Sequence, residues 1–487
     1  MIHAYTGTAV RAAEKPLLDA GQGEALMRQA AWGLATVVLR ELRARGPVSG
    51  TTVAALVGTG NNGGDALWAL TFLRRRGVDA VAVPTGERIH QAGLAALMKA
   101  GGRVAHAVPD SAGLLIDGVL GTGARGGWEP PRVPEGAAVV VACDLPSGVD
   151  ADTGHVAGGV LPADVTVTFG ALKTGLVVGA GAHAAGRVEV VDIGLGPHLG
   201  KPDVFSVERE DALEVFGPPA WDDHKYSRGV LGVCAGSDHY PGAAVLVCSS
   251  ALATGLGMVQ YAGPERAADL VLAAHPEVVV GPGTEGKAQA WVVGPGLGSD
   301  GDARRRLSEV VAACVGAGLP LVLDASALAL VELEDLGRLR SAGCEVVLTP
   351  HQGELLKLVD RLAPEIAEGF ADLAKADPVA VARRTAETLG AAVLLKGSTT
   401  VCAAPDGQTF VQNEGGAELA TAGTGDCLAG LVGSALARTS GDGQRSTVER
   451  AAAVAWLHGN AGERAAQEGP FGASRVPAAV QTVLADR

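Results

Sequence analysis

Short apolar runs recur along the chain, and each ends in a loop rich in glycine or aspartate before a helical pattern begins. In the first half these runs cover residues 52–57, 79–83, 114–120 and 137–143. Repeated strand–loop–helix units predict a parallel sheet with helices on both faces. We therefore expect an α/β fold whose strand-following loops gather at the carboxyl edge of each sheet.

The alternation lapses once, around residues 195–225, where glycine and proline are frequent and no period is evident. It restarts with apolar runs at residues 229–234, 291–294, 319–323, 345–348 and 391–395. The 487 residues are therefore expected to form two three-layer α/β domains, residues 1–212 and 213–487. Near the end, β-rich runs flank Pro405-Asp406-Gly407, which predicts a hairpin.

Composition restricts the class of partner and the compartment. The formal net charge is −14, which argues against a nucleic-acid partner because phosphate backbones recruit clustered Lys and Arg. The seven cysteines form no CxxC pair, which indicates a reducing compartment, and we expect a cytoplasmic protein. The uncharged stretch 241–264 is long enough to span a bilayer, but its polar residues and glycines favour a buried helix with its flanks.

The loop at residues 58–63 has the GxGxxG pattern, after a strand and before a helix expected at 65–76. Because the glycines of this loop carry no side chains, a pyrophosphate can approach the backbone closely at the helix N-terminus. An ordinary dinucleotide fold also needs an acid at the end of the second strand. Here Asp79 lies at the beginning of that strand, so the sequence disfavours a classical dehydrogenase.

Three loops of the first half carry groups that we expect to converge. Asn62, Asp117, Asp144 and Ser147 all follow strands, and such loops share one edge of a parallel sheet. Two carboxylates, an amide and a hydroxyl suit a hard cation, and a carboxylate beside it can move protons. Each acid taken alone fits a helix cap or a turn equally well.

The phrases GTGNNGGD, DGVLGTG and CDLPSGVDADTG, followed by ADVTVTFGALKTGL, together resemble the YjeF amino-terminal family over about residues 1–205. The resemblance implies a Rossmann-like NAD(P)H-hydrate epimerase in which Asp144 is a substrate-contacting acid, and we expect Asp144 to be the acid/base group. It also implies a potassium site at Asn62, Asp117 and Ser147. The hydrate-binding positions that it implies are Asn61, Asn62, Gly63, Gly64, Asp65, Gly121, Thr122, Gly123, Ala124, Arg125, Gly126, Gly127 and Asp144.

In the second half, the segment Gly423-Thr424-Gly425-Asp426 opens a predicted helix. Successive backbone N–H groups at such a turn form an anion hole suited to a transferring phosphoryl group. Asp426 then lies where it can take a proton from a substrate hydroxyl. Alone, this short match fits a capped helix as well, but HxGE at 351–354 and KGSTT at 396–400 precede it in order.

These motifs resemble the YjeF carboxyl-terminal family of the ribokinase-like superfamily, over about residues 222–487. The resemblance implies an ADP- or ATP-dependent NAD(P)H-hydrate dehydratase, with Mg²⁺ supported by Glu354. Hydrate-binding residues would be Ala243, Gly296 (with Gly298 as its rival), His351 and Asp426. Nucleotide-binding residues would be Lys396, Gly397, Ser398, Thr399, Thr400, Gly423, Thr424 and Gly425.

The sequence therefore predicts a bifunctional enzyme, an isomerase and a lyase, that repairs hydrated NADH and NADPH (NADHX and NADPHX). Its expected cofactors are K⁺ and Mg²⁺, with ADP as co-substrate, and we expect a homo-oligomer without nucleic-acid or membrane partners. The alternative is a ribokinase-like small-molecule kinase fused to a non-catalytic nucleotide-binding module. The sequence leaves open the choices between ADP and ATP and between NADHX and NADPHX.

Overall fold

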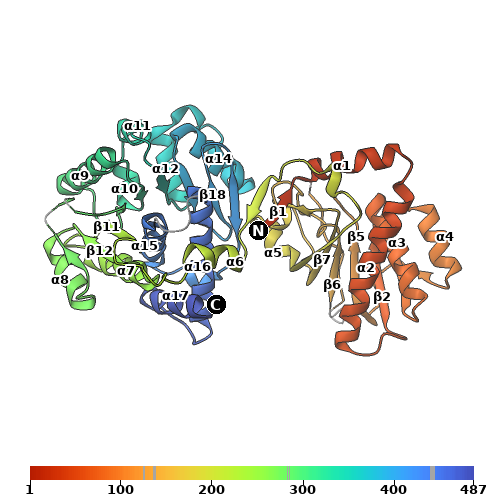
Figure 1. The fold of residues 1–487 in the computed structure, drawn as a ribbon. Helices are drawn as coiled ribbons and strands as arrows, with labels where there is room; N and C mark the ends of the chain where they lie inside the picture. The colour runs from red at the N-terminus through yellow and green to blue at the C-terminus, as the bar shows by residue number, and fades with distance from the viewer. Residues whose placement is uncertain (124–126, 135–138, 282, 285, 439–444, 487) are drawn as a thin grey trace. The chain divides into compact units, whose positions relative to one another are not determined.

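The computed structural model describes the chain except residues 124–126, 135–138, 282, 285, 439–444 and 487 (Figure 1). It divides into two compact units, His3–Val204 and Phe205–Arg487, the latter including Met1–Ile2. The division precedes α6 (Arg209–Val215), whereas the sequence predicted it between residues 212 and 213. Helix α6 packs against α16 of the second unit, and therefore the whole of α6 belongs to that unit.

The first unit contains a seven-stranded parallel sheet in the order β4-β3-β2-β5-β6-β7-β9. Its strands are β2 (Thr52–Val57), β3 (Asp79–Pro84), β4 (Arg103–Val104), β5 (Ala112–Gly118), β6 (Val140–Cys143), β7 (Val165–Phe169) and β9 (Arg187–Val191). A short parallel pair joins β1 (Ile2–Tyr5) to β8 (Leu172–Lys173). The strands predicted in this half are confirmed, with shifts of a few residues at their ends.

Helices lie on both faces of this sheet, because side chains of alternate strand residues point to opposite faces. On one face, Val53 and Ala55 of β2 pack with residues of α2 and α3. On the other, Thr166 of β7 donates to Ala185 O of α5, and loop residues such as Trp128 complete the cover. The helices are α1 (Gly7–Asp19), α2 (Gly23–Arg45), α3 (Asn61–Arg74), α4 (Gln91–Lys99) and α5 (Gly179–Ala185), with single turns at Thr174–Leu176 and Gly196–His198.

Helix α3 begins at Asn61, four residues before the predicted start at Asp65. Gly60 is the extended N-cap residue, so Asn61 to Gly64 already form the first helical turn. A Cβ on Gly63 would lie 2.1 Å from Gly58 O, so only glycine lets the helix start this close to the preceding strand. The prediction of the helix start was wrong because it assumed that the glycines form an open loop.

We expect Gly63→Ala to destabilise the first unit by about 2 kcal/mol, because overpacking against rigid backbone forces the helix start to move. Gly123→Ala is the matched control, since a Cβ there meets no atom of the described residues within 4 Å. Denaturant unfolding of both variants checks the expectation. Equal stability of the two variants would contradict it.

The second unit contains a mixed sheet in the order β13-β12-β11-β14-β15-β16-β17-β18-β19-β10. Its strands are β10 (Val204–Ser206), β11 (Val230–Cys234), β12 (Met258–Tyr261), β13 (Val279–Val280), β14 (Ala290–Val293), β15 (Leu321–Leu323), β16 (Val346–Leu348), β17 (Ala392–Leu395), β18 (Thr400–Ala403) and β19 (Thr409–Gln412). Strands β11 to β17 are parallel, whereas β18 is antiparallel to both neighbours. The hairpin predicted around Pro405-Asp406-Gly407 is confirmed as β18–β19.

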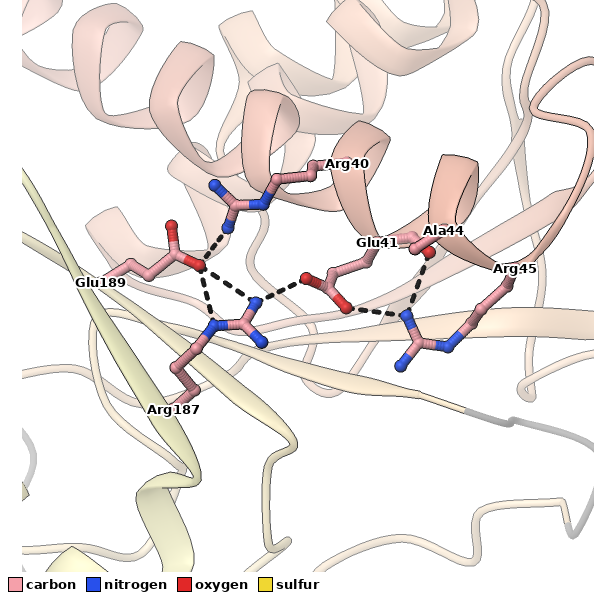
Figure 2. Close-up of a pocket in the computed structure, with 6 residues that line it drawn as sticks. All are labelled: Arg40, Glu41, Ala44, Arg45, Arg187 and Glu189. Atoms are coloured by element: carbon pink, nitrogen blue, oxygen red, sulfur yellow. Dashed lines mark hydrogen bonds and ion pairs between the residues drawn. The ribbon is translucent and has the colours of Figure 1, made fainter. Parts of the chain in front are cut away.

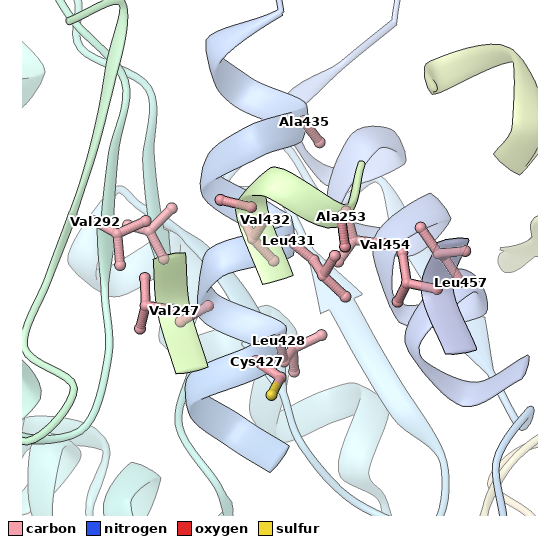
Figure 3. Packing of buried hydrophobic residues seen from close by; sticks show 14 of the residues in the cluster. Val247, Ala253, Val292, Cys427, Leu428, Leu431, Val432, Ala435, Val454 and Leu457 are labelled. Atoms are coloured by element: carbon pink, nitrogen blue, oxygen red, sulfur yellow. The ribbon is translucent and has the colours of Figure 1, made fainter. Parts of the chain in front are cut away.

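Helices α7, α15 and α16 pack together over one face of this sheet (Figure 3). Glycines inside α15 permit the contact: a Cβ on Gly430 would lie 2.3 Å from Val247 O of α7, and one on Gly433 would lie 2.3 Å from Val292 Cγ2 of β14. Tight packing here fixes the middle of α15 against α7 and β14. The helices of this unit are α6, α7 (Pro241–Ala253), α8 (Glu265–Ala274), α9 (Gly301–Ala317), α10 (Ser326–Leu330), α11 (Leu333–Ser341), α12 (Gln352–Leu362), α13 (Phe370–Ala376), α14 (Pro378–Leu389), α15 (Thr424–Ala437), α16 (Thr447–Ala466) and α17 (Val476–Ala485), with single turns at Pro364–Ile366, Ala417–Leu419 and Ala473–Arg475.

The uncharged stretch 241–264 contains the predicted helix, α7, and also strand β12, which was not predicted. In the described part of the chain, no helix is both long and apolar enough to cross a membrane. All seven cysteines are free thiols, and all but Cys344 are buried.

Candidate functional site

In the first unit, the loops after β2, β5 and β6 meet at the carboxyl edge of the sheet. The Asn62 amide, in the first turn of α3, donates to Leu120 O and to Cys143 O, each at 2.9 Å. One buried side chain therefore ties the loop after β5 and the end of β6 to the start of α3. The predicted convergence of these loops is present.

The Asp117 carboxylate, at the end of β5, holds the loop after β6. It accepts from Ser147 N at 2.7 Å and from Ser147 Oγ at 2.6 Å, and Ser147 Oγ accepts from Leu120 N at 2.9 Å. Complete burial raises the pKa of Asp117, and these hydrogen bonds oppose the rise. Among the described residues, neutral donors rather than a cation act on it.

Asp144, which follows β6, adopts an unusual backbone conformation with φ of 68°. Its Oδ1 accepts from Lys173 Nζ at 2.7 Å and from Thr168 Oγ1 at 3.1 Å. Its Oδ2 faces the neighbouring loop after β5, because a Cβ on Gly121 would lie 3.5 Å from that oxygen. One carboxylate oxygen is thus fixed, and the other is turned toward the predicted hydrate loop.

Lys173 was not among the predicted site residues. Its side chain is only 2% exposed, and it lies in the segment ALKTGL, an otherwise apolar run. A lysine is almost never fully buried without a partner, so a lone cation in such a run is a sequence signal for a buried acid. The sequence gives no indication which acid that is.

The remaining hydrate positions of the first unit are placed as follows. Asn61, Gly63, Gly64 and Asp65 belong to the first turns of α3, where Asp65 is buried. Gly121 lies beside Asn62 and Asp144, Thr122 O accepts from Arg11, and a Cβ on Gly127 would lie 3.9 Å from Ala157 O. Ala124, Arg125 and Gly126 lie outside the described residues.

In the second unit, the predicted anion turn opens α15. Gly423 is the left-handed N-cap with φ of 94°, a conformation that favours glycine. The Thr424 hydroxyl donates to Leu419 O at 2.8 Å and to Thr421 O at 2.9 Å, which fixes the turn. His458 of α16 is buried with its Nε2 3.1 Å from Thr424 O, and burial lowers its pKa to about 4.

Lys396 lies beside this turn: a Cβ on Gly425 would be 3.6 Å from its Nζ. The ammonium donates to Asp324 Oδ1 at 2.9 Å and lies 3.6 Å from Glu354 Oε2. Asp324 is 2% exposed and also accepts from Thr349 Oγ1 at 2.7 Å. Asp324 was not in the predicted set, although it follows β15 at the same sheet edge.

Asp426 lies in the first turn of α15, as predicted. Burial and the nearby Asp324 raise its pKa to about 6, and Lys396 opposes the rise. A pKa just below neutrality suits a general base.

The other predicted residues of the second unit surround this edge. Gly296, rather than Gly298, contacts Ala243: a Cβ on Gly296 would lie 2.6 Å from Ala243 Cβ, whereas one on Gly298 meets nothing within 4 Å. His351 is exposed and caps α12 through Nδ1, which accepts from Gly353 N at 3.0 Å. Thr399 donates to Asn413 at 2.6 Å, Gly397 and Ser398 lie in the turn between β17 and β18, and Thr400 begins β18.

A surface hollow of about 760 Å³ lies near the start of β9 in the first unit, away from the carboxyl edge that holds Asp117 and Asp144 (Figure 2). Its charged groups pair with one another: Glu41 with Arg45 at 2.7 Å and with Arg187 at 2.5 Å, and Glu189 with Arg40 and Arg187. Because each of these charged groups already has a partner, the hollow offers no chemistry comparable with the two strand-end clusters.

Comparison with known proteins supports a two-part chain. The family model described as NAD(P)H-hydrate dehydratase matches residues 231–481, and the one described as YjeF-related protein N-terminus matches residues 23–175. The bifunctional NAD(P)H-hydrate repair enzyme Nnr of Mycobacterium tuberculosis (strain CDC 1551 / Oshkosh) is 45% identical, with 90% of this chain and 89% of the relative covered. That of Mycobacterium leprae (strain TN) is 41% identical over the full length of both.

Among solved structures, the ADP/ATP-dependent NAD(P)H-hydrate dehydratase of Bacillus subtilis, co-crystallized with ATP/Mg²⁺, is similar to the second unit. It is 25% identical with a TM-score of 0.50, and the match covers 58% of this chain and 98% of that one. The two resemblances predicted from the sequence are confirmed. The chain belongs to the bifunctional NAD(P)H-hydrate repair enzyme family.

Proposed function

We propose that this chain repairs hydrated nicotinamide cofactors, NADHX and NADPHX, in two steps. The first unit interconverts the R and S epimers of the hydroxyl on carbon 6, with Asp144 moving a proton. The second unit removes the hydroxyl from the S epimer at the expense of ADP, releasing AMP and phosphate. A cytoplasmic location and a homo-oligomeric state stay predictions from the sequence.

The observation that carries the dehydratase step is the juxtaposition of Asp426, the Gly423–Gly425 turn and Lys396. Hydroxide is a poor leaving group, whereas phosphate is a good one, so dehydration is easier once a phosphoryl group has been transferred to the hydroxyl. Asp426 takes the hydroxyl proton, and the backbone N–H groups of the turn stabilise the moving phosphoryl group. Lys396, whose ammonium lies next to Gly425, adds positive charge to the same place.

Two metal ions belong to the proposal. Within the described residues, no three His, Cys, Asp or Glu side chains gather to hold a metal, so a cation in the first unit relies on mixed oxygen ligands. Asn62, Asp117 and Ser147 fit K⁺, because the hydrogen-bond network joins them around a buried carboxylate on which no cation of the described residues acts. Glu354 would support Mg²⁺ bound to the nucleotide, and the ion would neutralise phosphate charge there.

The test supplies purified R or S hydrate to the full chain with ADP, with ATP and with neither, and follows recovery of reduced-nicotinamide absorbance. We expect conversion of both epimers with ADP, together with release of AMP. A stable phosphorylated product without reduced nicotinamide would instead identify a small-molecule kinase.

We expect Asp144→Ala to convert the R hydrate about a hundredfold more slowly while converting the S hydrate at the normal rate, because a general acid/base group contributes at least that factor. The S hydrate is the internal control, since its conversion needs only the second unit. Equal conversion of the R hydrate by both proteins would remove Asp144 from the proposal.

A further inference from the structure

Two buried carboxyl groups of the first unit have very different partners. Asp144 accepts from a buried ammonium and a hydroxyl. Asp65, in the first turns of α3, is only 9% exposed, and it has no hydrogen-bond partner among the described residues. It lies close enough to Asp144 for the two charges to interact. Its carboxyl oxygens are not among the fully enclosed polar atoms of the described residues, so they remain accessible to a ligand.

We propose that the two acids have different roles in the epimerase reaction. Lys173 holds Asp144 in place as the proton acceptor, and Asp65 is the proton donor. The inference rests on the function proposed above and deepens it. Lys173 is a positioning residue, because its ammonium acts through Asp144 rather than on the substrate.

The geometry around Lys173 supports its positioning role. The ammonium has three N–H groups and three acceptors: Asp144 Oδ1 at 2.7 Å, Thr168 Oγ1 at 2.9 Å and Phe169 O at 2.7 Å. With all three N–H groups bonded within the protein, Lys173 has no free N–H group to bind a substrate. It holds Asp144 Oδ1 in place and leaves Asp144 Oδ2 turned toward the Gly121 loop.

The surroundings of Asp65 favour the protonated form. Burial raises its pKa well above the usual value, and the negative charges of Asp144 and Glu14 raise it further. Lys173 lowers the pKa of Asp65, but its effect is the smallest of the four. The Cys143 thiol also lies near Asp65, and burial keeps this thiol neutral. Two acids whose environments separate their proton affinities form an acid/base pair.

The reaction balances with these two groups alone. Asp65 gives its proton to the hydroxyl on carbon 6, the C–O bond breaks, and the ring nitrogen's lone pair forms a C=N bond as water leaves. Water then adds to the opposite face, the C=N electron pair returns to nitrogen, and Asp144 takes the proton released by the added water. Solvent returns the proton from Asp144 to Asp65 before the next turnover.

The experiment measures R/S exchange by the full chain without nucleotide, and then ADP-dependent conversion of the S hydrate. We expect Asp65→Asn, which keeps shape and neutrality but cannot give a proton, to lower kcat for exchange about a hundredfold with KM little changed. Asp19→Asn is the matched control, because Asp19 is an exposed acid of the same unit. Conversion of the S hydrate should be unchanged in both variants.

Lys173→Met supplies a readout that a merely structural role would not move. Without the ammonium that holds Asp144 Oδ1, kcat for exchange should fall while KM stays little changed. Thr168→Val, which removes one donor to the same oxygen and one acceptor of the Lys173 ammonium, should lower kcat by less. Normal exchange by Asp65→Asn, or a normal kcat in Lys173→Met, would overturn the inference, whereas absence of exchange in the unaltered chain would overturn the proposed function itself.

Discussion

Replacing Asp426 by Asn is expected to lower ADP-dependent conversion of the S hydrate about a thousandfold, in line with the loss of a general base. Asparagine keeps the size of the side chain and the packing of α15 but cannot accept the hydroxyl proton. R/S exchange in the first unit should stay normal, which separates lost chemistry from misfolding. Asp372→Asn is the matched control, because Asp372 is an acid of the same unit with a 91% exposed side chain.

The pH dependence follows from the same carboxyl group. Asp426 acts as a base only when ionised, and burial together with Asp324 raises its pKa to about 6. Conversion of the S hydrate should therefore rise with pH up to about 6 and level off above it. A rate that is flat between pH 5 and pH 7 (on the order of one unit either side of that pKa), or a normal rate for Asp426→Asn, would contradict the assignment of the base.

The sequence was sufficient where short-range patterns decide the structure. Short apolar runs predicted most strands of both sheets but not β7 or β12, and Pro405-Asp406-Gly407 predicted the hairpin that makes the second sheet mixed. The start of α3 was wrong because the decisive contact, Gly63 against Gly58 O, is invisible in a pattern that treats glycines as loop residues. Residue spacing also placed Asn62, Asp117 and Ser147 together, since loops after parallel strands share an edge.

Both residues that the sequence missed are halves of long-range ion pairs. Lys173 meets Asp144 from 29 positions away, and Asp324 meets Lys396 from 72 positions away. The periodicity of apolar residues indicates which face of a strand is buried, but it does not indicate which charged residue of another segment lies next to a buried charge. The partners of a buried charge can be assigned only once the strand order is known, so sequence analysis named Asp144 and Asp426 as site residues but neither Lys173 nor Asp324.

The pair of Lys396 and Asp324 allows stability and chemistry to be measured separately. Lys396→Met is expected to destabilise the second unit by about 3 kcal/mol, because Asp324, 2% exposed, is left as a buried charge without its cation. The same variant should lose at least a hundredfold in S-hydrate conversion, since a cation beside the anion turn is gone. Calorimetry checks the first expectation, and the ADP-dependent assay checks the second.

Adding Asp324→Asn to Lys396→Met should restore stability to within about 1 kcal/mol, because removing both charges relieves the penalty that removing one creates. The double variant should nevertheless stay as inactive as Lys396→Met, since a neutral amide in place of the Asp324 carboxylate cannot replace the ammonium next to Gly425. Recovery of activity together with stability would mean that Lys396 serves only to neutralise Asp324. Recovery of stability alone places the ammonium in the phosphoryl-transfer step, where the charge of the nucleotide requires it.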